Sequence, residues 1–293
     1  MNINETESRR LAMLQVCDSV FPVGAFALSN GMETFVQRDF LRRGADFEEY
    51  MKNYLEVAPY KEIGQMVLAG KYATDSRVSR KGLAERLIEL DELASALQSA
   101  REIREGSERM CTRLVKLAEQ MDAGQAQTSD GHRGFAKPSP ADNATTSAAD
   151  SRENSIIAVH EHHTERHQLH DAADGLYGSP SLDLYAGLIR ERRCRGLHSI
   201  AMGLYAADHA NDVRDAAIMY GYSLLSALTM CAAKAIPLSQ YAGQVALHDS
   251  FPRLVRAVNI AMTLKPEDLG ISGAYLDIAA MQHEILYSRL YMS

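Results

Sequence analysis

The sequence predicts an all-α protein, a single helical domain of about ten helices around a buried central helix. Three observations support this fold class. One long stretch, residues 216–236, is apolar or small at almost every position. Apolar residues recur at helical spacing, three or four positions apart, in most other segments. No segment shows a clear strand pattern.

The stretch 216–236 is the expected centre of the domain. It reads AAIMYGYSLLSALTMCAAKAI, carries Lys234 as its single charge and is stopped by Pro237. A helix that is apolar on all sides has to be buried on all sides. A membrane span has a similar length, but Ala, Gly, Ser, Thr and Tyr make up most of this stretch. We therefore expect a core helix that also reaches a subunit interface.

Composition limits the possible partners and the compartment. The chain has 293 residues, a formal net charge of −7 and no basic stripe interleaved with aromatic residues, which excludes a nucleic-acid partner. The N-terminus, MNINETESRR, is polar and no apolar signal segment follows it. The four cysteines lie far apart and are expected to be reduced packing residues: Cys17, Cys111, Cys194 and Cys231. We expect a soluble, cytoplasmic protein with no membrane partner.

The first half of the chain contains a series of predicted helices. Apolar spacing places them at 9–20, 46–57, 63–72, 81–97 and 100–121. Ser29 or Asn30 is expected to cap a further helix through residues 32–36. Asp46, with Glu49 three residues later, resembles a capping box at the start of a helix.

The segment between the first two helices, residues 18–33, is called the opening loop below. Pro22 and Gly24 interrupt the helical pattern, and no Gly-Lys-Ser/Thr follows, so it is not a phosphate-binding loop. One interpretation is a structured connection in which Phe21 and Phe26 fill the core. The other is a binding surface, because so apolar a turn is costly to expose to water.

Residues 122–180 form a predicted disordered insertion, rich in Gly, Ser, Ala, Thr, Asp and Pro. It contains a histidine tract: His160, His162, His163, His167 and His170. Imidazole is a common ligand of nickel and zinc. The tract is therefore either a solvated polar linker or a loose metal-binding segment.

Helical spacing resumes after Pro180. Predicted helices start at Ser181 and Leu197, and Ser239 is expected to cap a short one. Two more cover about 254–262 and the region from Ala274, where Ile278, Met281 and Ile285 share one stripe. A basic cluster follows the predicted helix that starts at Ser181: Arg190, Arg192, Arg193 and Arg195. This cluster either contacts an acidic partner or is solvated.

The sequence offers little support for catalysis. The GxSxG, HExxH, Walker and dinucleotide fingerprints are absent. Asp277, His283 and Glu284 lie close together in the sequence, and a helical hydrolase that uses His283 and Asp277 is the enzymatic alternative. The lack of any stronger constellation favours a binding or assembly protein.

Four blocks of sequence together resemble one family. They are LQVCDSVFPVGAFALSNGMETFV, AREIREGSERMCTRLVKLA, AAKAIPLSQYAGQVAL and the tail DLGISGAYLDIAAMQHEILYSRLYMS. In this order they resemble the urease accessory protein UreF family. The resemblance implies an all-helical homodimer that has no catalytic activity and binds no cofactor stably. It also implies binding to UreD (also called UreH), recruitment of the GTPase UreG, and delivery of nickel by that complex to the subunits of apo-urease.

On this basis we expect three partner-binding surfaces. The first, a groove for the GTPase, uses Tyr220, Tyr222, Ser226, Lys234 and Gln240. The second is the tail, residues 282–293, expected to become ordered on UreD and represented by His283, Tyr287, Arg289 and Leu290. The third is the opening loop, with Asp18, Ser19, Phe21, Pro22, Gly24 and Glu33. Alternatively, the tyrosines of the first surface bond internally and Lys234 reaches solvent.

The chain departs from the family pattern in three places. The insertion is longer than expected, Ser239 replaces a usual glycine, and Ala25 replaces another. Ser239 is expected to permit the turn before the short helix, although serine can adopt fewer backbone conformations than glycine. The histidine tract is not part of the family pattern, so a nickel-storage protein remains the alternative within the binding class.

Overall fold

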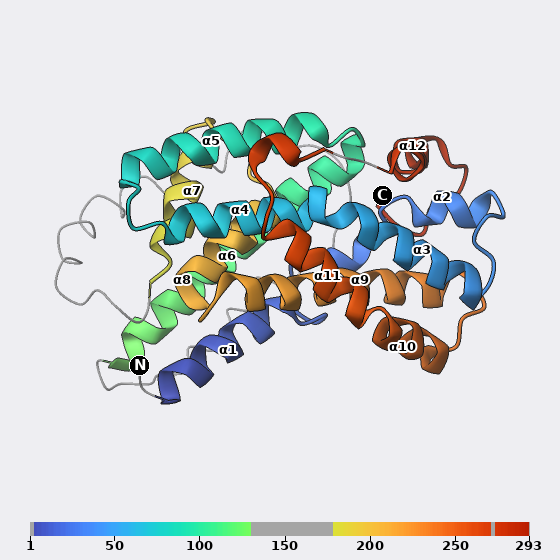
Figure 1. The fold of residues 1–293 in the computed structure, drawn as a ribbon, viewed down its shortest axis with the longest axis horizontal. Coiled ribbons are helices and arrows are strands. Elements are labelled where there is room, and N and C mark those ends of the chain that lie inside the picture. Colours follow the sequence, from blue (N-terminus) through green and yellow to red (C-terminus); the bar gives the residue numbers. More distant parts are fainter. Residues whose placement is uncertain (1–2, 130–177, 271–272, 293) are drawn as a thin grey trace, which may run out of the picture. The chain divides into compact units, whose positions relative to one another are not determined.

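The computed structural model describes residues 3–129, 178–270 and 273–292. Within these ranges the chain contains helices and turns but no strand, which confirms the all-α fold (Figure 1). The α-helices are α1 Ile3–Cys17, α2 Met32–Gln37, α3 Gly44–Val57, α4 Glu62–Thr74, α5 Arg80–Leu97, α6 Arg101–Ser129, α7 Pro180–Arg190, α8 His198–His209, α9 Val213–Ala235, α10 Gln240–Asp249, α11 Phe251–Ala261 and α12 Ala274–Gln282. Short 3₁₀ turns are η1 Ala25–Ala27, η2 Ala58–Tyr60, η5 Pro266–Asp268 and η6 His283–Ile285.

The chain divides into two compact units. The first, Met1–Ala118 with Ser179–Ser293, is the helical domain, and the second is Glu119–Gly178. The expected insertion limits need correction, because α6 continues through 122–129 and Pro180 already belongs to α7. Residues 121–129 contain no proline and several good helix formers, so α6 can continue. Residues 130–177 of the predicted insertion, including the histidine tract, lie outside the described residues.

The most deeply buried pair of helices is α4 and α8. Every residue of α4 from Ile63 to Gly70 is buried, and so is every residue of α8 from His198 to Ala206. A glycine makes this contact possible, because a Cβ atom on Gly203 would lie 2.1 Å from the carbonyl oxygen of Met66. The two backbones thus approach each other more closely than any other residue would allow.

The helix α9 has the expected central position but is not buried on all sides. It touches α1, α2, α4, α8, α10, α11 and η1. Its buried face includes Tyr220, Leu225 and Leu228, whereas Tyr222, Met230 and Lys234 are exposed. The expectation of all-round burial was wrong because Ala, Ser and Gly, neither strongly apolar nor large, occupy much of the helix. By length and composition α9 could cross a membrane, but half of it packs inside the domain, as in the core helix of a soluble protein.

Helix starts follow local chemistry where a cap residue is present. The hydroxyl groups of Ser79 and Ser239 accept the backbone N–H of Gly82 and Ala242, each at 3.1 Å. Asp46 acts differently from the expectation. It is the third residue of α3, and its carboxylate accepts the backbone N–H groups of Arg42 and Arg43 before the helix.

The start of α2 also differs from the expectation. Its N-cap is Gly31 rather than Ser29 or Asn30, although the Ser29 hydroxyl accepts the N–H of Glu33 at 3.4 Å. Gly31 has φ of 80°, and a Cβ atom there would lie 2.7 Å from the backbone nitrogen of Ala280. Close packing against α12 therefore selects glycine at this position.

All four cysteines are buried thiols, as expected of packing residues. Burial raises the pKa of the Cys17 thiol to about 12, although a hydrogen bond from Ser223 opposes the shift. Burial also raises the pKa of Cys194 to about 12. These thiols are therefore poor nucleophiles.

Candidate partner-binding site

A cluster of four ionisable side chains holds the C-terminal tail against the domain. We call Glu33, Glu102, His283 and Arg289 the tail cluster. His283 is fully buried, with Nδ1 2.7 Å from Glu102 Oε2 and Nε2 2.9 Å from Glu33 Oε2. Arg289 Nη1 donates to Glu102 Oε1 at 2.6 Å. The cluster joins α2, α6 and the tail, which are far apart in sequence.

His283 connects the two carboxylates of the tail cluster through both of its ring nitrogens. Nδ1 faces Glu102 and Nε2 faces Glu33, while Arg289 contacts the second oxygen of Glu102. Because His283 and Glu33 are buried, loss of one partner leaves the polar group of the other without its contact, which is costly.

The backbone of the tail is also fixed by Glu33. Its two carboxylate oxygens accept the N–H groups of Leu290 at 2.7 Å and Tyr291 at 3.1 Å. The next residue, Met292, donates its N–H to the carbonyl oxygen of Ala27 in the opening loop at 2.8 Å. The Tyr291 hydroxyl donates to the carbonyl oxygen of Cys231 in α9 at 2.8 Å. The tail therefore contacts α9 and the opening loop, the elements that carry most of the other two expected surfaces.

The expectation that the tail needs a partner to become ordered was wrong. Within the described residues, 282–292 already bond to α2, α6, α9 and the opening loop. Sequence reasoning missed Glu102 and the buried role of Glu33, because both act through a contact with a residue more than a hundred positions away. No local pattern marks such a contact.

The outward side of α12 and the tail is apolar. Its exposed residues are Tyr275, Ile278, Met281, Ile285, Tyr287 and Leu290. Tyr287 is fully exposed, and the side chain of Leu290 is 70% exposed. The stripe of Ile278, Met281 and Ile285 that the sequence predicted thus faces outward. Clustered exposed apolar residues of this kind mark protein-binding surfaces.

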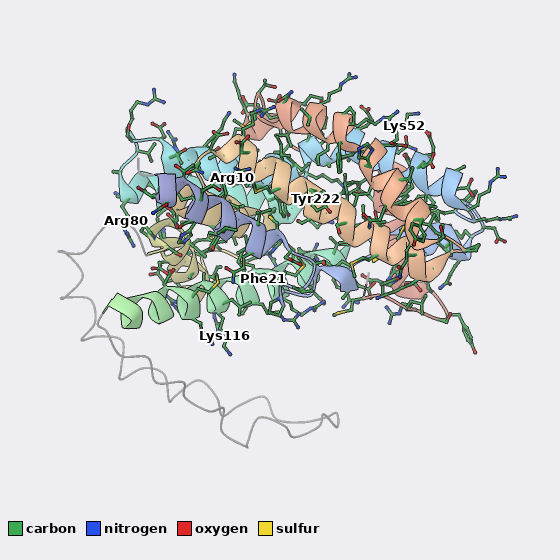
Figure 2. The ribbon with its side chains drawn as sticks, turned by 90° about the horizontal axis from the view of Figure 1, so that it is seen from below. Arg10, Phe21, Lys52, Arg80, Lys116 and Tyr222 are labelled. Atoms are coloured by element: carbon green, nitrogen blue, oxygen red, sulfur yellow. The ribbon has the colours of Figure 1, made fainter. Side chains whose placement is uncertain are left out.

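The exposed side of α9 carries three of the residues expected there. Tyr222, Ser226 and Lys234 follow each other at multiples of four residues, and Met230 completes the row. Ser226 is half-buried, and the other three are exposed. We call these four residues the α9 stripe. The Tyr222 ring, labelled in Figure 2, belongs to α9. It lies edge-on to Phe251 of α11, with 6.1 Å between the ring centroids. Gln240, the first residue of α10, is exposed.

Tyr220 does not belong to this surface. Its side chain is buried on the opposite side of α9, and burial raises the pKa of its hydroxyl group well above the usual value. The expectation that it contacts a partner was therefore wrong, and its burial agrees with the alternative of an internal tyrosine. Lys234 is exposed, as that alternative also expected, whereas Tyr222 is not internal.

The opening loop combines a buried and an exposed part. Phe21, labelled in Figure 2, is buried, as the first interpretation expected. Asp18, Ser19 and Pro22 are exposed. Gly24 has φ of 89° and lies against Arg113, which donates to the carbonyl oxygen of Val23 at 3.0 Å. The first interpretation is confirmed for Phe21, and the binding surface stays a prediction. The side chain of Phe26 lies outside the described part of the chain.

The residues of the hydrolase alternative do not form one site. Asp277 forms an ion pair with Lys61, and Glu284 pairs with Arg101 on the surface at 3.1 Å. His283 faces Glu33 and Glu102 instead, with no exposed surface from which a substrate could be reached. The buried position of His283, which would be the base of this enzyme, therefore contradicts the helical hydrolase.

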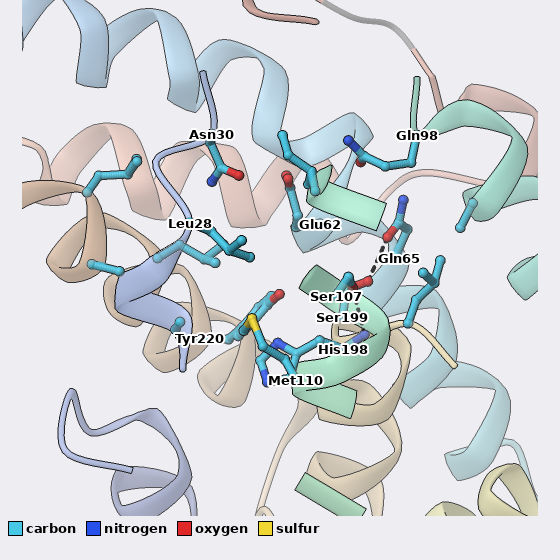
Figure 3. Close-up of a pocket in the computed structure, with 17 residues that line it drawn as sticks. Leu28, Asn30, Glu62, Gln65, Gln98, Ser107, Met110, His198, Ser199 and Tyr220 are labelled. Atoms are coloured by element: carbon cyan, nitrogen blue, oxygen red, sulfur yellow. Dashed lines mark hydrogen bonds between the residues drawn. The ribbon is translucent and has the colours of Figure 1, made fainter. Parts of the chain in front are cut away.

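A cavity of about 60 Å³ lies between the opening loop, α4, α6, α8 and α9 (Figure 3). Its walls are mainly apolar, with Leu28, Ile103, Met110 and Leu224 among them. Its polar residues include Glu62 and His198, which the sequence analysis did not associate with any site. His198 is buried.

Metal binding is not supported by the described residues. Among them, no group of three or more His, Cys, Asp or Glu side chains is placed to hold an ion. The five histidines proposed as loose metal ligands lie outside the described ranges, so that hypothesis stays a prediction. The basic cluster near α7 is largely solvated, and Arg195 pairs with Glu108 at 3.8 Å.

Known proteins match almost the whole chain. A sequence model of the family described as UreF matches residues 41–163 and 166–251. The "Urease accessory protein UreF" of Haemophilus influenzae (strain ATCC 51907 / DSM 11121 / KW20 / Rd) is 30% identical over 283 residues, which cover 96% of this chain and 94% of the relative. The protein of the same name from Bacillus sp. (strain TB-90) is 27% identical over 287 residues, covering 98% and 100%. That of Streptococcus salivarius (strain 57.I) is 25% identical over 286 residues, covering 97% and 94%.

Proposed function

Because the chain belongs to the UreF family of urease accessory proteins and so has a role in urease maturation, we propose that it is a cytoplasmic, homodimeric scaffold. It binds UreD (UreH) and recruits the GTPase UreG, and the complex delivers nickel to the subunits of apo-urease. The chain itself is not an enzyme and holds no cofactor of its own. Nickel is the cargo of the complex.

The observation that carries this proposal is the arrangement of the tail. Hydrogen bonds from Tyr291 and Met292 connect the tail to α9 and to the opening loop. The outward residues Ile285, Tyr287 and Leu290 are left exposed on an ordered backbone. An apolar surface on an ordered segment binds a partner without a large entropic cost of ordering. UreD is therefore assigned to the outer side of α12 and the tail.

The α9 stripe and Gln240 are assigned to the GTPase groove of the dimer. Tyr222 and Met230 supply apolar contact area, while Lys234 adds a positive charge at the end of the helix. Interfaces favour such aromatic and methionine residues over charged ones at their centres. Tyr222 and Phe251, which are in contact, provide a rigid aromatic pair at the start of this surface.

Co-purification with UreD and UreG, followed by light scattering, tests the proposal. We expect a ternary complex that contains two copies of this chain. The double variant Ile285→Ser/Tyr287→Ser should lose UreD, and Tyr222→Ala/Lys234→Ala should lose the GTPase but keep UreD. Gln244→Ala, an exposed position on α10 outside the assigned residues, is the matched control. A folded wild-type chain that captures neither partner would refute the scaffold.

A further inference from the structure

The loop between α2 and α3 presents a large aromatic side chain to solvent. Phe40 is 72% exposed, although the next residue, Leu41, is buried. A single exposed apolar residue is normal on a protein surface. Two observations distinguish Phe40 from such a residue. Its backbone holds it in a fixed outward position, and aromatic contacts join it to the apolar surface of α12 and the tail.

The backbone around Phe40 is held by hydrogen bonds. The N–H groups of Phe40 and Leu41 both donate to the carbonyl oxygen of Phe35, at 2.9 and 3.2 Å. Asp39 has φ of 64°, a left-handed value that few residues other than glycine adopt. Because Leu41 is held in the core, turning Phe40 inward would require these bonds to break. A partner can therefore bind Phe40 at a small cost in conformational entropy.

Aromatic contacts make Phe40 continuous with α12. The ring of Phe35 lies edge-on to Phe40, with 6.5 Å between the ring centroids. The same ring lies edge-on to Tyr275 of α12, with 6.0 Å between the centroids. Edge-to-face pairs at these distances are favourable aromatic contacts. Phe35 thus connects the exposed ring of Phe40 to the exposed ring of Tyr275.

Hydrogen bonds hold α2 against both α12 and the tail. The Thr34 hydroxyl donates to the carbonyl oxygen of Ala279 in α12 at 2.7 Å. The side-chain amide of Gln37 donates to the carbonyl oxygen of Ser288 in the tail. Accordingly, α2 and α12 lie next to each other in Figure 1. The loop with Phe40 therefore extends the surface that the proposed function assigns to UreD.

The extended surface has the area that a stable complex needs. It consists of Phe40 and the exposed apolar residues of α12 and the tail named above, each exposed by about half or more. Aromatic side chains bury about 150–250 Å² each on binding, and a standard interface takes about 800 Å² from each partner. The three aromatic rings and four other apolar side chains of this surface supply most of that area.

Charge next to Phe40 favours a different protein over a second copy of this chain. Arg42 and Arg43 pair with aspartates at 3.4 and 3.6 Å. Arg38 is exposed and forms no ion pair with the described residues. A second copy would bring the same positive charge to the interface, whereas a carboxylate of another protein would pair with it.

We propose that Phe40 is an anchor of the surface assigned to UreD, and that this partner takes the Phe40 ring into an apolar pocket with a carboxylate at its rim. The inference rests on the proposed function, because UreD is the partner assigned to α12 and the tail. It adds a contact from outside the tail and states the chemistry of the partner's side. Rigid aromatic residues that fill a pocket contribute much of the binding energy of protein interfaces.

Capture of UreD by surface variants tests the anchor. Phe40→Ser should weaken capture at least about tenfold, whereas Phe40→Leu, which keeps an apolar side chain, should retain most of it. Because Phe40 is mostly exposed, both variants should melt close to the wild type. Leu11→Ser, the matched control, removes a 64% exposed apolar residue of α1 outside the assigned surfaces and should leave capture unchanged. Arg38→Gln should make capture less sensitive to salt, and an unchanged salt dependence would overturn the carboxylate at the rim.

The tail variant Ile285→Ser/Tyr287→Ser separates this inference from the scaffold. If it loses UreD while Phe40→Ser captures UreD as well as the wild type does, the anchor is refuted and the scaffold stands. If Phe40→Ser loses the GTPase but keeps UreD, Phe40 serves another partner and the proposal is refuted. Light scattering that shows a dimer for the wild type and a monomer for Phe40→Ser would assign this surface to a second copy instead. If the wild type captures no UreD, the scaffold itself fails.

Discussion

At the scale of single residues, His283 has the largest expected effect on the tail. It is fully buried and, among the described side chains, is the one that contacts Glu33 and Glu102 together. Removing it takes away the side-chain partner of the buried Glu33 carboxylate, whereas Glu102 keeps Arg289. The exposed pair of Arg101 and Glu284 also joins α6 to the tail, but in water its attraction is screened.

The variant His283→Ala should therefore lose about 3 kcal/mol of unfolding free energy in urea titrations. Backbone amides of Leu290 and Tyr291 should exchange with solvent faster, because their acceptor Glu33 loses its position. Arg101→Ala, the control, should cost less than about 1 kcal/mol. Equal effects of the two variants would contradict the account of the tail cluster.

His198 gives the stability a defined pH dependence. Its pKa is about 4 in the folded chain, because of burial, against an ordinary value of 6.5. Above pH 6.5 the imidazole is neutral in both states and contributes nothing. As the pH falls from 6.5 to 4, the unfolded chain takes up a proton that the folded chain does not, so stability is lost. Below pH 4 both states are charged and the loss stays constant.

Comparison of the wild type with His198→Phe isolates this contribution. Between pH 6.5 and pH 4 the wild type should lose up to about 3 kcal/mol more unfolding free energy than the variant. His209 and Asp208 titrate in the same range but are common to both proteins, so they cancel in the difference. Parallel stability curves for the two proteins would show that His198 is not buried in its neutral form.

At the scale of elements, the sequence was most informative where chemistry is local. Ser79 and Ser239 cap the helices that follow them, and the leucine spacing predicted α5 almost to the residue. The start of α2 was not predictable in the same way. Gly31 is required there by the backbone of Ala280, and nothing near Gly31 in the sequence indicates that neighbour.

Ser239 shows why one departure from the family pattern is tolerated. Its φ of −67° and ψ of 151° are ordinary extended values, so glycine is not needed for the backbone, and its hydroxyl caps α10 instead. Ser239→Ala should cost about 1 kcal/mol of unfolding free energy, and Ser239→Gly only a few tenths. Chemical denaturation of both variants measures the difference. A larger loss for glycine than for alanine would contradict the cap.

At the scale of the whole molecule, the candidate site could be predicted only in outline. The opening loop, α9 and the tail were all expected as surfaces, but as separate ones. The contacts that join them connect residues as far apart as Glu33 and His283, which are 250 positions apart. Long-range pairing of this kind leaves no periodic trace in a single sequence. The cavity with Glu62 and His198 was missed for the same reason.

The central claim is that partners bind the outer surface of the tail and the α9 stripe. Hydrogen–deuterium exchange of the chain alone and in the ternary complex tests it most directly. We predict that UreD binding protects residues 275–292, and that addition of the GTPase protects residues 222–240, with little change in α5 or α7. Protection confined to other helices, with the tail unchanged, would contradict the account.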